Sequence, residues 1–525
     1  MMRDKWPRGF SSILALLFFS AIICSSCKNY HRNSTHADVT TKSISKGEEL
    51  AKVYCQYCHL LPDPSLLDSK SWENGVLPQM GPRLGIFSYG FKNYPRLHDS
   101  NLGDDYYPKH PLLTQDDWQN IIDYYTATSP DSLPPQNRKY PIKNGLPLFN
   151  AEIPNIKYQK SATSYLKIMP GDSLHSIILS DAIKQNLLFI NSKGGITDSI
   201  NGTGPVVDID FSSNKLLACD IGVLNPNNGK FGKGVVVNAT PSGHFQKDSF
   251  ALIDGLQRPV QITSVDLNND GKKDYLVCEF GFLTGALSWM ENLGNNKFEK
   301  HIIRNVPGAI KAYVQDYNHD GLPDLWVLFA QGDEGIFLFT NKGNGNFSQE
   351  EVLRFPPMYG SSSFELVDFN KDGYPDILYT CGDNADYSIV LKPYHGVYIF
   401  MNDKTNHFTQ KFFYPINGCY KAIARDFDGD GDLDIATISF FADYAHQPEE
   451  GFVYLRNEGN FDFHPFTLAE TKIGRWLTMD AGDIDGDGKI DLILGNFSIG
   501  PSMMKHQVDW KKSPPFLILK NTGQK

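Results

Sequence analysis

The sequence predicts a small all-α domain followed by an all-β propeller of seven blades. Amphipathic helical patterns occur only before residue 130 of the 525-residue chain. From about residue 155 onward, short β-type runs alternate with Gly/Asn turns, and one acidic loop pattern recurs five times at intervals of 50 to 58 residues. A repeat of that length indicates one supersecondary unit per repeat, and a chain of this length is expected to hold more than one domain.

Residues 1–27 are typical of an export signal. Arg3, Lys5 and Arg8 precede an apolar run from Ile13 to Cys24. This run is too short to span the ~30 Å hydrocarbon core of a bilayer, and it is typical of a signal-peptide core. The signal could be cleaved to release a secreted protein, or it could be retained as a membrane anchor. Either alternative places the body of the protein outside the cytoplasm.

The small residues before Cys27 resemble a bacterial lipobox, which implies that Cys27 is lipidated, with Cys24 as the alternative. Residues 28–44 are polar and lack apolar periodicity, so they are expected to be a tether. The resemblance implies attachment to a membrane through an N-terminal lipid. The favoured location is the periplasmic side of the bacterial outer membrane, and the cell surface is the other.

Residues 45–129 are expected to form the helical domain. Ser45–Glu48 reads as a capping box that would start a helix running into Cys55. A second helix is predicted from Thr114, with acidic residues in its first turn, where they suit the helix dipole. Its apolar face follows the i, i+3, i+4, i+7 spacing and consists of Trp118, Ile121, Ile122 and Tyr125.

The segment Cys55-Gln-Tyr-Cys58-His59 reads C-x-x-C-H, the attachment pattern of a c-type haem. Two thiols at this spacing can bond to the two vinyl groups of one porphyrin, while the imidazole of His59 ligates the iron. A thioredoxin-like dithiol or half of a zinc site are the alternatives. The first needs a βαβ context and the second needs another Cys/His pair, and neither follows in the sequence.

A first helix leading into C-x-x-C-H and a last helix packed across it resemble the class I cytochrome c fold. The resemblance implies one covalent haem c, with Gly47 as the small residue at the helix crossing. It also implies Met80 as the sixth ligand, in a loop rich in Gly and Pro. His98 and His110 are the alternative ligands, and Ala51 departs from the aromatic residue usual at its position.

Residues 130–154 are rich in proline and are expected to form a stiff linker. The five acidic loops that follow share oxygen-bearing residues at positions 1, 3, 5 and 9 and a glycine at position 6. This is the ligand chemistry of Ca²⁺ in a shortened EF-hand arrangement, so up to five Ca²⁺ ions are expected; an ion-free hairpin turn is the alternative. The expected ligands are Asp266, Asn268, Asp270, Asp274, Asp316, Asn318, Asp320, Asp324, Asp368, Asn370, Asp372, Asp376, Asp426, Asp428, Asp430, Asp434, Asp483, Asp485, Asp487 and Asp491.

Four apolar β-runs surround each loop, as in a propeller blade. The loops and runs resemble the FG-GAP/VCBS repeats of integrin-like propellers over residues 155–525. Two degenerate units, in residues 164–200 and around residues 206–210, add to the five complete ones to give seven blades. Ring closure is expected between residues 156–161 and the last strand, residues 516–520.

The calcium loops are expected on one rim of the propeller, and a binding site on the opposite rim. The long loops there carry aromatic, histidine and cationic side chains that could stack on sugars or dock a protein. The equally plausible alternative is that these side chains are exposed to solvent and bind no ligand. The candidates are Tyr394, His395, His446, Arg475, Trp476, His506 and Trp510. No hydrolase or HExxH pattern stands out, so no catalytic residue is assigned.

The eight cysteines include four in the propeller half. Cys381 and Cys419 could meet across adjacent loops in a compartment that allows disulfides. Cys219 and Cys278 are expected to be buried free thiols.

A formal net charge of -11 and a pI of about 5.7 argue against a nucleic-acid partner. Three functions are open. The favoured one is a lipid-anchored electron carrier whose haem cycles between Fe(II) and Fe(III) and whose propeller docks a redox protein. The second is a haem c-linked dehydrogenase whose propeller oxidises an extracytoplasmic substrate such as a glycan. The third is a glycan- or protein-binding adhesion propeller with a redox-sensing haem.

Overall fold

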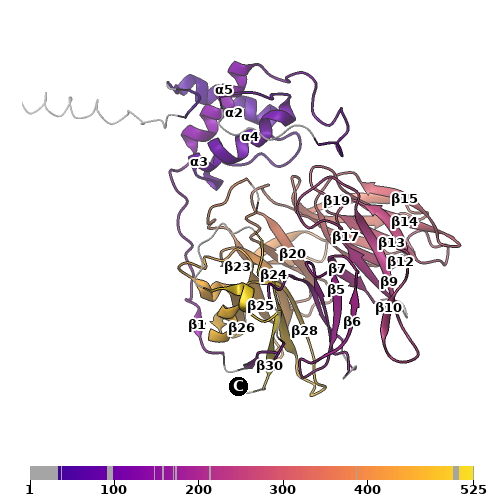
Figure 1. The fold of residues 1–525 in the computed structure, drawn as a ribbon. Helices are drawn as coiled ribbons and strands as arrows, with labels where there is room; N and C mark the ends of the chain where they lie inside the picture. Colours follow the sequence, from indigo (N-terminus) through magenta and orange to yellow (C-terminus); the bar gives the residue numbers. More distant parts are fainter. Residues whose placement is uncertain are drawn as a thin grey trace, which may run out of the picture.

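The computed structural model describes residues 33–523, except 37, 91–98, 147, 157–158, 170, 172–173, 212–214, 386 and 501–507. These residues form a helical unit that lies over one rim of a seven-bladed β-propeller (Figure 1). The propeller predicted from the repeats is confirmed. The expected lipidation site Cys27, the export signal and His506 lie outside the described residues. Within the described ranges, no helix combines the length and apolar character needed to cross a bilayer.

The helical unit packs two long helices across each other. Its elements are α2 (Thr41–Tyr54), η1 (Pro64–Leu66), α3 (Ser69–Ser71), η2 (Trp72–Val76), α4 (Leu77–Met80), η3 (Gly81–Leu84) and α5 (Gln115–Thr128). Gly47 lies where α2 meets α5, and a Cβ atom added to it would lie 1.9 Å from the carbonyl oxygen of Asn120. The expectation for Gly47 is therefore confirmed, as are the start of α5 at Thr114 and its buried apolar face.

The start of α2 differs from the expectation. The Ser43 amide donates to Thr40 Oγ1 at 3.0 Å, and the Thr40 amide donates to Ser43 Oγ at 3.1 Å. This reciprocal cap starts the helix before residues 45–48, which lie inside it. Part of the expected tether is also fixed, because Asn33 donates to Asp123 Oδ1 at 3.0 Å.

Seven sheets form the propeller, and most consist of four antiparallel strands in chain order. Blades 1 and 2 contain β3 (Thr163–Ile168), β4 (Ile177–Asp181), β5 (Asn186–Ile190), β6 (Ile196–Asn201), then β7 (Val206–Asp210), β8 (Leu216–Asp220), β9 (Gly232–Ala239), β10 (Phe245–Lys247) and β11 (Ile253–Leu256). Blades 3 and 4 contain β12 (Pro259–Val265), β13 (Asp274–Glu279), β14 (Ala286–Gly294), β15 (Lys297–Arg304), then β16 (Ala309–Gln315), β17 (Asp324–Phe329), β18 (Gly335–Asn341) and β19 (Phe347–Arg354).

Blades 5 and 6 contain β20 (Ser361–Val367), β21 (Asp376–Cys381), β22 (Gly396–Asn402), β23 (Phe408–Pro415), then β24 (Cys419–Arg425), β25 (Asp434–Ser439), η4 (Pro448–Gly451), β26 (Phe452–Asn457), β27 (Phe463–Thr467) and η5 (Ala469–Ile473). Blade 7 contains β28 (Trp476–Gly482), β29 (Asp491–Asn496), η6 (Trp510–Lys512) and β30 (Phe516–Asn521). The first strand of each blade lies nearest the central axis, so each acidic loop joins an inner strand to the second strand, as predicted.

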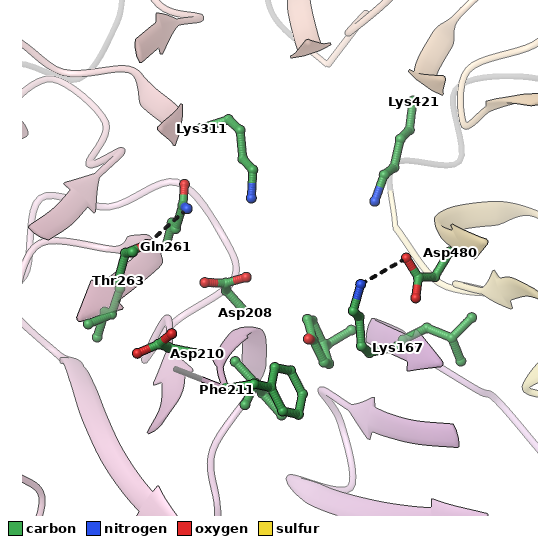
Figure 2. A pocket seen from close by; sticks show the side chains of 13 residues that line it. Lys167, Asp208, Asp210, Phe211, Gln261, Thr263, Lys311, Lys421 and Asp480 are labelled. Carbon is green, nitrogen blue, oxygen red and sulfur yellow. Dashed lines mark hydrogen bonds and ion pairs between the residues drawn. The ribbon is translucent and has the colours of Figure 1, made fainter. Parts of the chain in front are cut away.

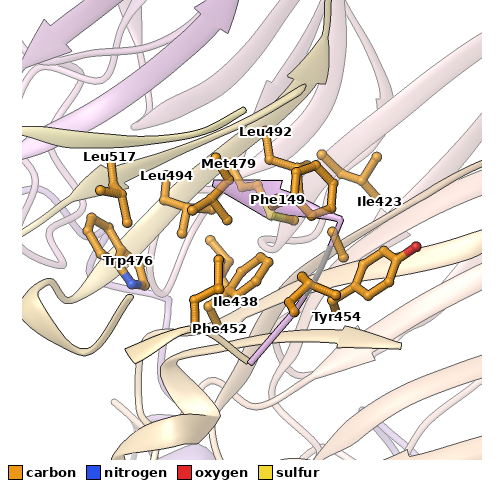
Figure 3. Packing of buried hydrophobic residues seen from close by; sticks show 14 of the residues in the cluster. Phe149, Ile423, Ile438, Phe452, Tyr454, Trp476, Met479, Leu492, Leu494 and Leu517 are labelled. Atoms are coloured by element: carbon orange, nitrogen blue, oxygen red, sulfur yellow. The ribbon is translucent and has the colours of Figure 1, made fainter. Parts of the chain in front are cut away.

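The ring closes at β2 (Phe149–Glu152), which pairs antiparallel with β30. This strand lies in the expected linker and precedes residues 156–161, where closure was expected. Phe149 explains the difference, because its ring is buried among Tyr454, Met479 and Leu492 between blades 6 and 7 (Figure 3). Ala162, directly before the first strand of blade 1, bridges instead to Phe497 of blade 7.

The rest of the proline-rich segment also runs along the propeller. β1 (Lys143–Asn144) adds a parallel strand to the edge of blade 6. Arg138 donates to Pro415 O at 2.9 Å and forms an ion pair with the buried carboxylate of Glu450. The ring of Tyr140 stacks on His464 at 4.2 Å between centroids. The segment is therefore a strap that fixes the helical unit to blades 5 to 7 rather than a free linker.

Candidate functional site

The C-x-x-C-H segment follows directly after α2. Cys55 is the C-cap of the helix, and its amide donates to Ala51 O at 2.8 Å. Its thiol is partly buried beside Tyr125, and burial raises its pKa to about 12. Cys58 is exposed. The two thiols are therefore free, with Cys55 against the helical core and Cys58 at the surface.

His59 is held in one tautomer. Its Nδ1 lies 2.8 Å from Leu60 O and donates its proton to that carbonyl, so Nε2 is the nitrogen with a free lone pair. Burial lowers the pKa of His59, and the nearby guanidinium groups of Arg83 and Arg354 lower it further. A neutral imidazole whose other nitrogen is bound to a carbonyl is the arrangement that metal-ligating histidines adopt.

Apolar side chains are exposed around the two cysteines. Val53, Tyr57 and Leu60 are 64%, 89% and 37% exposed, although all three lie within eight residues of sequence. Tyr57 and Leu60 also line the cavity beside His59, so exposed apolar atoms face that space.

The opposite wall of this site comes from the propeller. A cavity of about 340 Å³ is lined by residues 56–61 and by Asp333 and Arg354 of blade 4. Asp333 bridges two guanidinium groups, those of Arg304 and Arg354. The guanidinium of Arg304 also lies 3.9 Å from the ring centroid of Phe337. The C-x-x-C-H segment therefore faces a fixed charged cluster on the propeller.

Met80, the expected sixth ligand, is the last residue of α4, and η3 follows at once. It lies in a helical turn rather than in an irregular loop, because residues 77–84 continue the helical path through Pro78 and Pro82. Met80 is partly buried against the same apolar core that Cys55 contacts. Of the two alternative ligands, His110 is exposed and His98 lies outside the described residues.

The helical unit covers part of the rim on which a binding site was expected. The Tyr394 hydroxyl donates to Leu66 O at 3.0 Å, and the Tyr106 hydroxyl donates to Leu283 O at 3.1 Å. Met358, from the loop between blades 4 and 5, is buried in the apolar core of the helical unit. Tyr394 is therefore an interdomain contact and not part of an open binding surface.

Among the described residues, the other expected rim residues do not form one open site, although Arg475 and Trp510 meet, with the Arg475 guanidinium 5.7 Å from the Trp510 ring centroid. His395 and Trp476 are buried, and the indole of Trp476 donates to Thr471 O at 2.8 Å. Arg475 is also buried, with its guanidinium 3.6 Å from the ring centroid of Phe440. Trp510 packs edge-on against Tyr444. Only His446 has a well-exposed side chain, and it lies 3.0 Å from Asp443.

The acidic loops have the shape expected of them. In each loop the first aspartate accepts hydrogen bonds from the amide of the position-6 glycine, for example Gly271 N to Asp266 Oδ2 at 2.8 Å. Carboxylate oxygens converge within 4.8 Å of one another in two of them, at Asp426, Asp428 and Asp430, and at Asp483, Asp485 and Asp491. Such clusters of hard oxygen atoms could hold Ca²⁺.

The ninth residue of each loop has an additional role that the sequence analysis missed. Asp324 is buried, and its Oδ1 accepts from the Asn341 amide at 2.7 Å. The Asn341 side chain then donates to Leu267 O at 3.0 Å and accepts from Gly343 N at 2.9 Å. Equivalent asparagines close the other complete blades and are Asn292, Asn402, Asn457 and Asn521. The sequence carries a signal for this role, an asparagine at or near the end of the third strand in each of the five blades with a complete loop.

The four propeller cysteines in the described part of the chain are buried free thiols. The expectation for Cys219 and Cys278 is confirmed. Cys381 and Cys419 are not joined: the Cys381 thiol donates to Tyr394 O at 3.3 Å, and the Cys419 sulfur lies 3.2 Å from Thr437 Oγ1.

The comparisons with known proteins concern the propeller. The model of the FG-GAP-like repeat matches residues 266–327 and 316–379, so the chain contains FG-GAP-like repeats. Among solved structures, the chain is similar to Saccharomyces cerevisiae Sqt1, at 8% identity over 73% of this chain and 99% of that chain, with a TM-score of 0.42. It is also similar to streptogramin B lyase, at 12% identity over 71% of this chain and 98% of that chain, with a TM-score of 0.43.

Proposed function

We propose that this chain is a lipid-anchored c-type haem protein that transfers single electrons. The observation that carries the proposal is the C-x-x-C-H segment with the tautomer of His59 fixed by Leu60 O. Cys55 and Cys58 would hold the haem through thioether bonds, and His59 Nε2 would ligate its iron. The bound haem would supply an iron centre that changes between Fe(II) and Fe(III).

The residues around the segment suit such a group. The exposed apolar side chains of Val53, Tyr57 and Leu60 would be covered by the porphyrin, which removes an unfavourable apolar surface from water. Burial and neighbouring arginines keep His59 neutral, as a metal ligand requires. Met80 is the proposed sixth ligand, and a thioether there would raise the reduction potential relative to a second imidazole.

The covalent attachment has a direct test. Cys55→Ala combined with Cys58→Ala should abolish haem that survives a denaturing gel, while Cys219→Ala should leave it unchanged. Retention of covalent haem in the double variant would reject the attachment site. Met80→His should shift the visible spectrum to bis-imidazole character, and an unchanged spectrum would assign the sixth position to another residue.

The proposal includes a lipid on Cys27 and a location outside the cytoplasm. Cys27→Ser should then move the protein from the membrane fraction to the soluble fraction, and Cys24→Ser is the matched control. Release by Cys24→Ser alone would assign the lipid to Cys24. Release by neither variant would contradict a lipid anchor.

Calcium in the five acidic loops is proposed as a structural cofactor. The convergence of three carboxylates at Asp426, Asp428 and Asp430 supports it, because these like charges repel one another unless a cation lies between them. The loops lie on the rim away from the helical unit, so the ions would stiffen the blades rather than contact the haem.

A binding propeller is the second candidate function. The FG-GAP-like repeats are compatible with a docking role, and the redox partner or substrate would then bind the propeller. The observation that favours this candidate is a charged cavity on the propeller axis.

A further inference from the structure

The inner strands of the propeller enclose a cavity of about 400 Å³ on its central axis (Figure 2). Six of the seven blades contribute to its wall through β3, β7, β12, β16, β24 and β28. The cavity is lined by charged side chains, which is unusual for the centre of a packed domain. It shares no lining residue with the cavity at the C-x-x-C-H segment, so a ligand could bind here whether or not haem is attached.

One end of the cavity is closed. The inner strands are buried where they begin and progressively more exposed toward their ends, as in β12 and β20. At the closed end, Ala162, Phe440 and Phe497 form an apolar cluster between blades 1, 6 and 7. The inner strands end at the acidic loops, so the cavity is a cup that opens on that rim and not toward the helical unit.

Three lysines point into the cup from different blades. Lys167 forms an ion pair with Asp480, with Nζ 3.2 Å from Oδ1, and Asp480 Oδ2 also accepts from the Ile168 amide at 2.9 Å. Lys311 and Lys421 extend into the cavity from the other side (Figure 2). Among the described residues, no carboxylate lies within 4.0 Å of either of these two ammonium groups.

The two unpaired lysines carry an energetic cost to the empty protein. Burial lowers the pKa of Lys421, and the like charges of Lys311 and Lys167 lower it further, against the attraction of Asp480. Holding two ammonium groups in a half-buried cavity with no directly paired carboxylate, and only the more distant charges of Asp208 and Asp480, costs folding free energy. An anion bound between them would remove that cost.

The remaining wall of the cup offers hydrogen-bond acceptors. Gln261 is committed to the fold, because its Oε1 accepts from the Ala312 amide at 2.7 Å and its Nε2 donates to Ala312 O at 3.0 Å. Asp208 faces the cavity across from Lys311 (Figure 2). It accepts from the Ile262 amide, and its carboxylate can accept a further hydrogen bond from a ligand hydroxyl. Burial raises the pKa of Asp208, and Lys311 opposes that rise.

We infer that the cup binds a small polyhydroxylated organic anion. Its carboxylate or phosphate would lie between the ammonium groups of Lys311 and Lys421, and a hydroxyl would donate to Asp208. Three aspartates also line the cavity, but Asp480 is bound to Lys167 and to the Ile168 amide, and Asp210 is bound to Ser264. Among the described residues, Lys311 and Lys421 are therefore the lining cations without an ion pair, and an anion suits them better than a bare metal cation does. A neutral sugar would leave the two ammonium groups without a counter-charge.

Isothermal titration calorimetry on the full chain tests the inference, with glucuronate, glucose 6-phosphate and glucose as probes. Binding of either anion, with glucose much weaker, supports it, and the anion that binds identifies carboxylate or phosphate as the recognised group. Lys311→Gln and Lys421→Gln should each weaken that binding about tenfold or more, because each loses a charge-assisted hydrogen bond. Lys193→Gln, on an exposed turn, should bind like the unaltered protein.

Thermal unfolding distinguishes a variant that has lost anion binding from one that has failed to fold. Lys421→Gln should fold and melt at a temperature equal to or above that of the unaltered protein, since it removes an unpaired charge. Calorimetric titration thus reports anion binding, and the melting temperature reports whether each variant is folded. No heat with either anion, glucose binding as tightly as the anions, or binding unchanged in both lysine variants would overturn the inference.

Discussion

Gly47 shows how much of the helical unit depends on one missing side chain. It lets α2 approach α5 so closely that no Cβ atom fits between them. Glycine is otherwise unfavourable inside a helix, so its presence there is explained by packing. The same crossing positions Cys55 at the end of α2.

Replacing Gly47 with alanine should destabilise the helical unit by about 1–3 kcal/mol, because the new methyl group overlaps the carbonyl of Asn120. Tryptophan fluorescence during urea unfolding measures the change, since Trp72 and Trp118 are buried in this unit. Gly103→Ala is the control, because nothing lies within 4 Å of a Cβ atom there. Equal stability of the two variants would contradict the account.

Residue types alone did not separate binding residues from core residues. Trp476 and His395 have side chains typical of a sugar-binding rim, yet both are buried. Conversely, Lys311 and Lys421 lie within β16 and β24, and they face a cavity. Which side chains meet at the axis depends on the closure of the ring, and no single repeat contains that information.

The acidic loop and the asparagine after the third strand act together as one element. The loop aspartate at position 9 and the asparagine satisfy buried backbone groups on three neighbouring segments. Buried polar groups without partners are costly, so this pair stabilises each complete blade whether or not an ion is bound.

Asn341→Ala should lower the free energy of unfolding by about 1–3 kcal/mol, because it leaves the carbonyl of Leu267 and the amide of Gly343 without partners. Urea denaturation followed by circular dichroism provides the measurement. Gln349→Ala, on the exposed face of β19, is the matched control. If the free energy of unfolding falls no further than in the control variant, the aspartate–asparagine pair does not stabilise the blade.

Removal of calcium should lower the melting temperature. Each occupied loop stabilises the folded state by RT ln(1 + [L]/Kd), about 2.7 kcal/mol at a hundredfold excess of ion over Kd. Differential scanning calorimetry with and without a chelator measures the shift, and added Ca²⁺ should reverse it where added Mg²⁺ does not. An identical melting temperature in both buffers would show that the loops are ion-free turns.

Elements were predicted well where local chemistry decides them. The α5 helix follows from Thr114 and its apolar spacing, and each glycine at position 6 of the loops adopts the left-handed conformation that the turn needs. Elements defined by distant partners were missed. β2 is a strand only because β30 lies beside it, and its proline-rich surroundings gave no β signal.

At the scale of the whole molecule, the helical unit and the propeller share a packed interface. Met358 of the propeller is buried in the helical core, and Tyr394 contacts a carbonyl 328 residues away in the sequence. From the helical unit the strap runs along the propeller, where β1 joins blade 6 (Figure 1) and β2 completes blade 7. The repeats predicted the seven blades, but no pattern in the sequence predicted that the helical unit packs against the propeller.

Met358→Ala should cost about 2–5 kcal/mol, as truncation of a buried methionine does, and should uncouple the two units. Calorimetry should then show two transitions in place of one. Ile389→Ala, a 43% exposed side chain in the adjacent rim loop, should keep the single transition. Unchanged cooperativity in the Met358 variant would show that the interface does not couple the units.

The proposed electron transfer depends on a covalent haem at the C-x-x-C-H segment. The deciding measurement is a pyridine haemochrome assay with a reduced-minus-oxidised visible spectrum, on the full chain made in a host that matures c-type cytochromes. We expect a c-type spectrum at one haem per chain. Protein that folds in the same host but carries no covalent haem would contradict the proposed electron transfer.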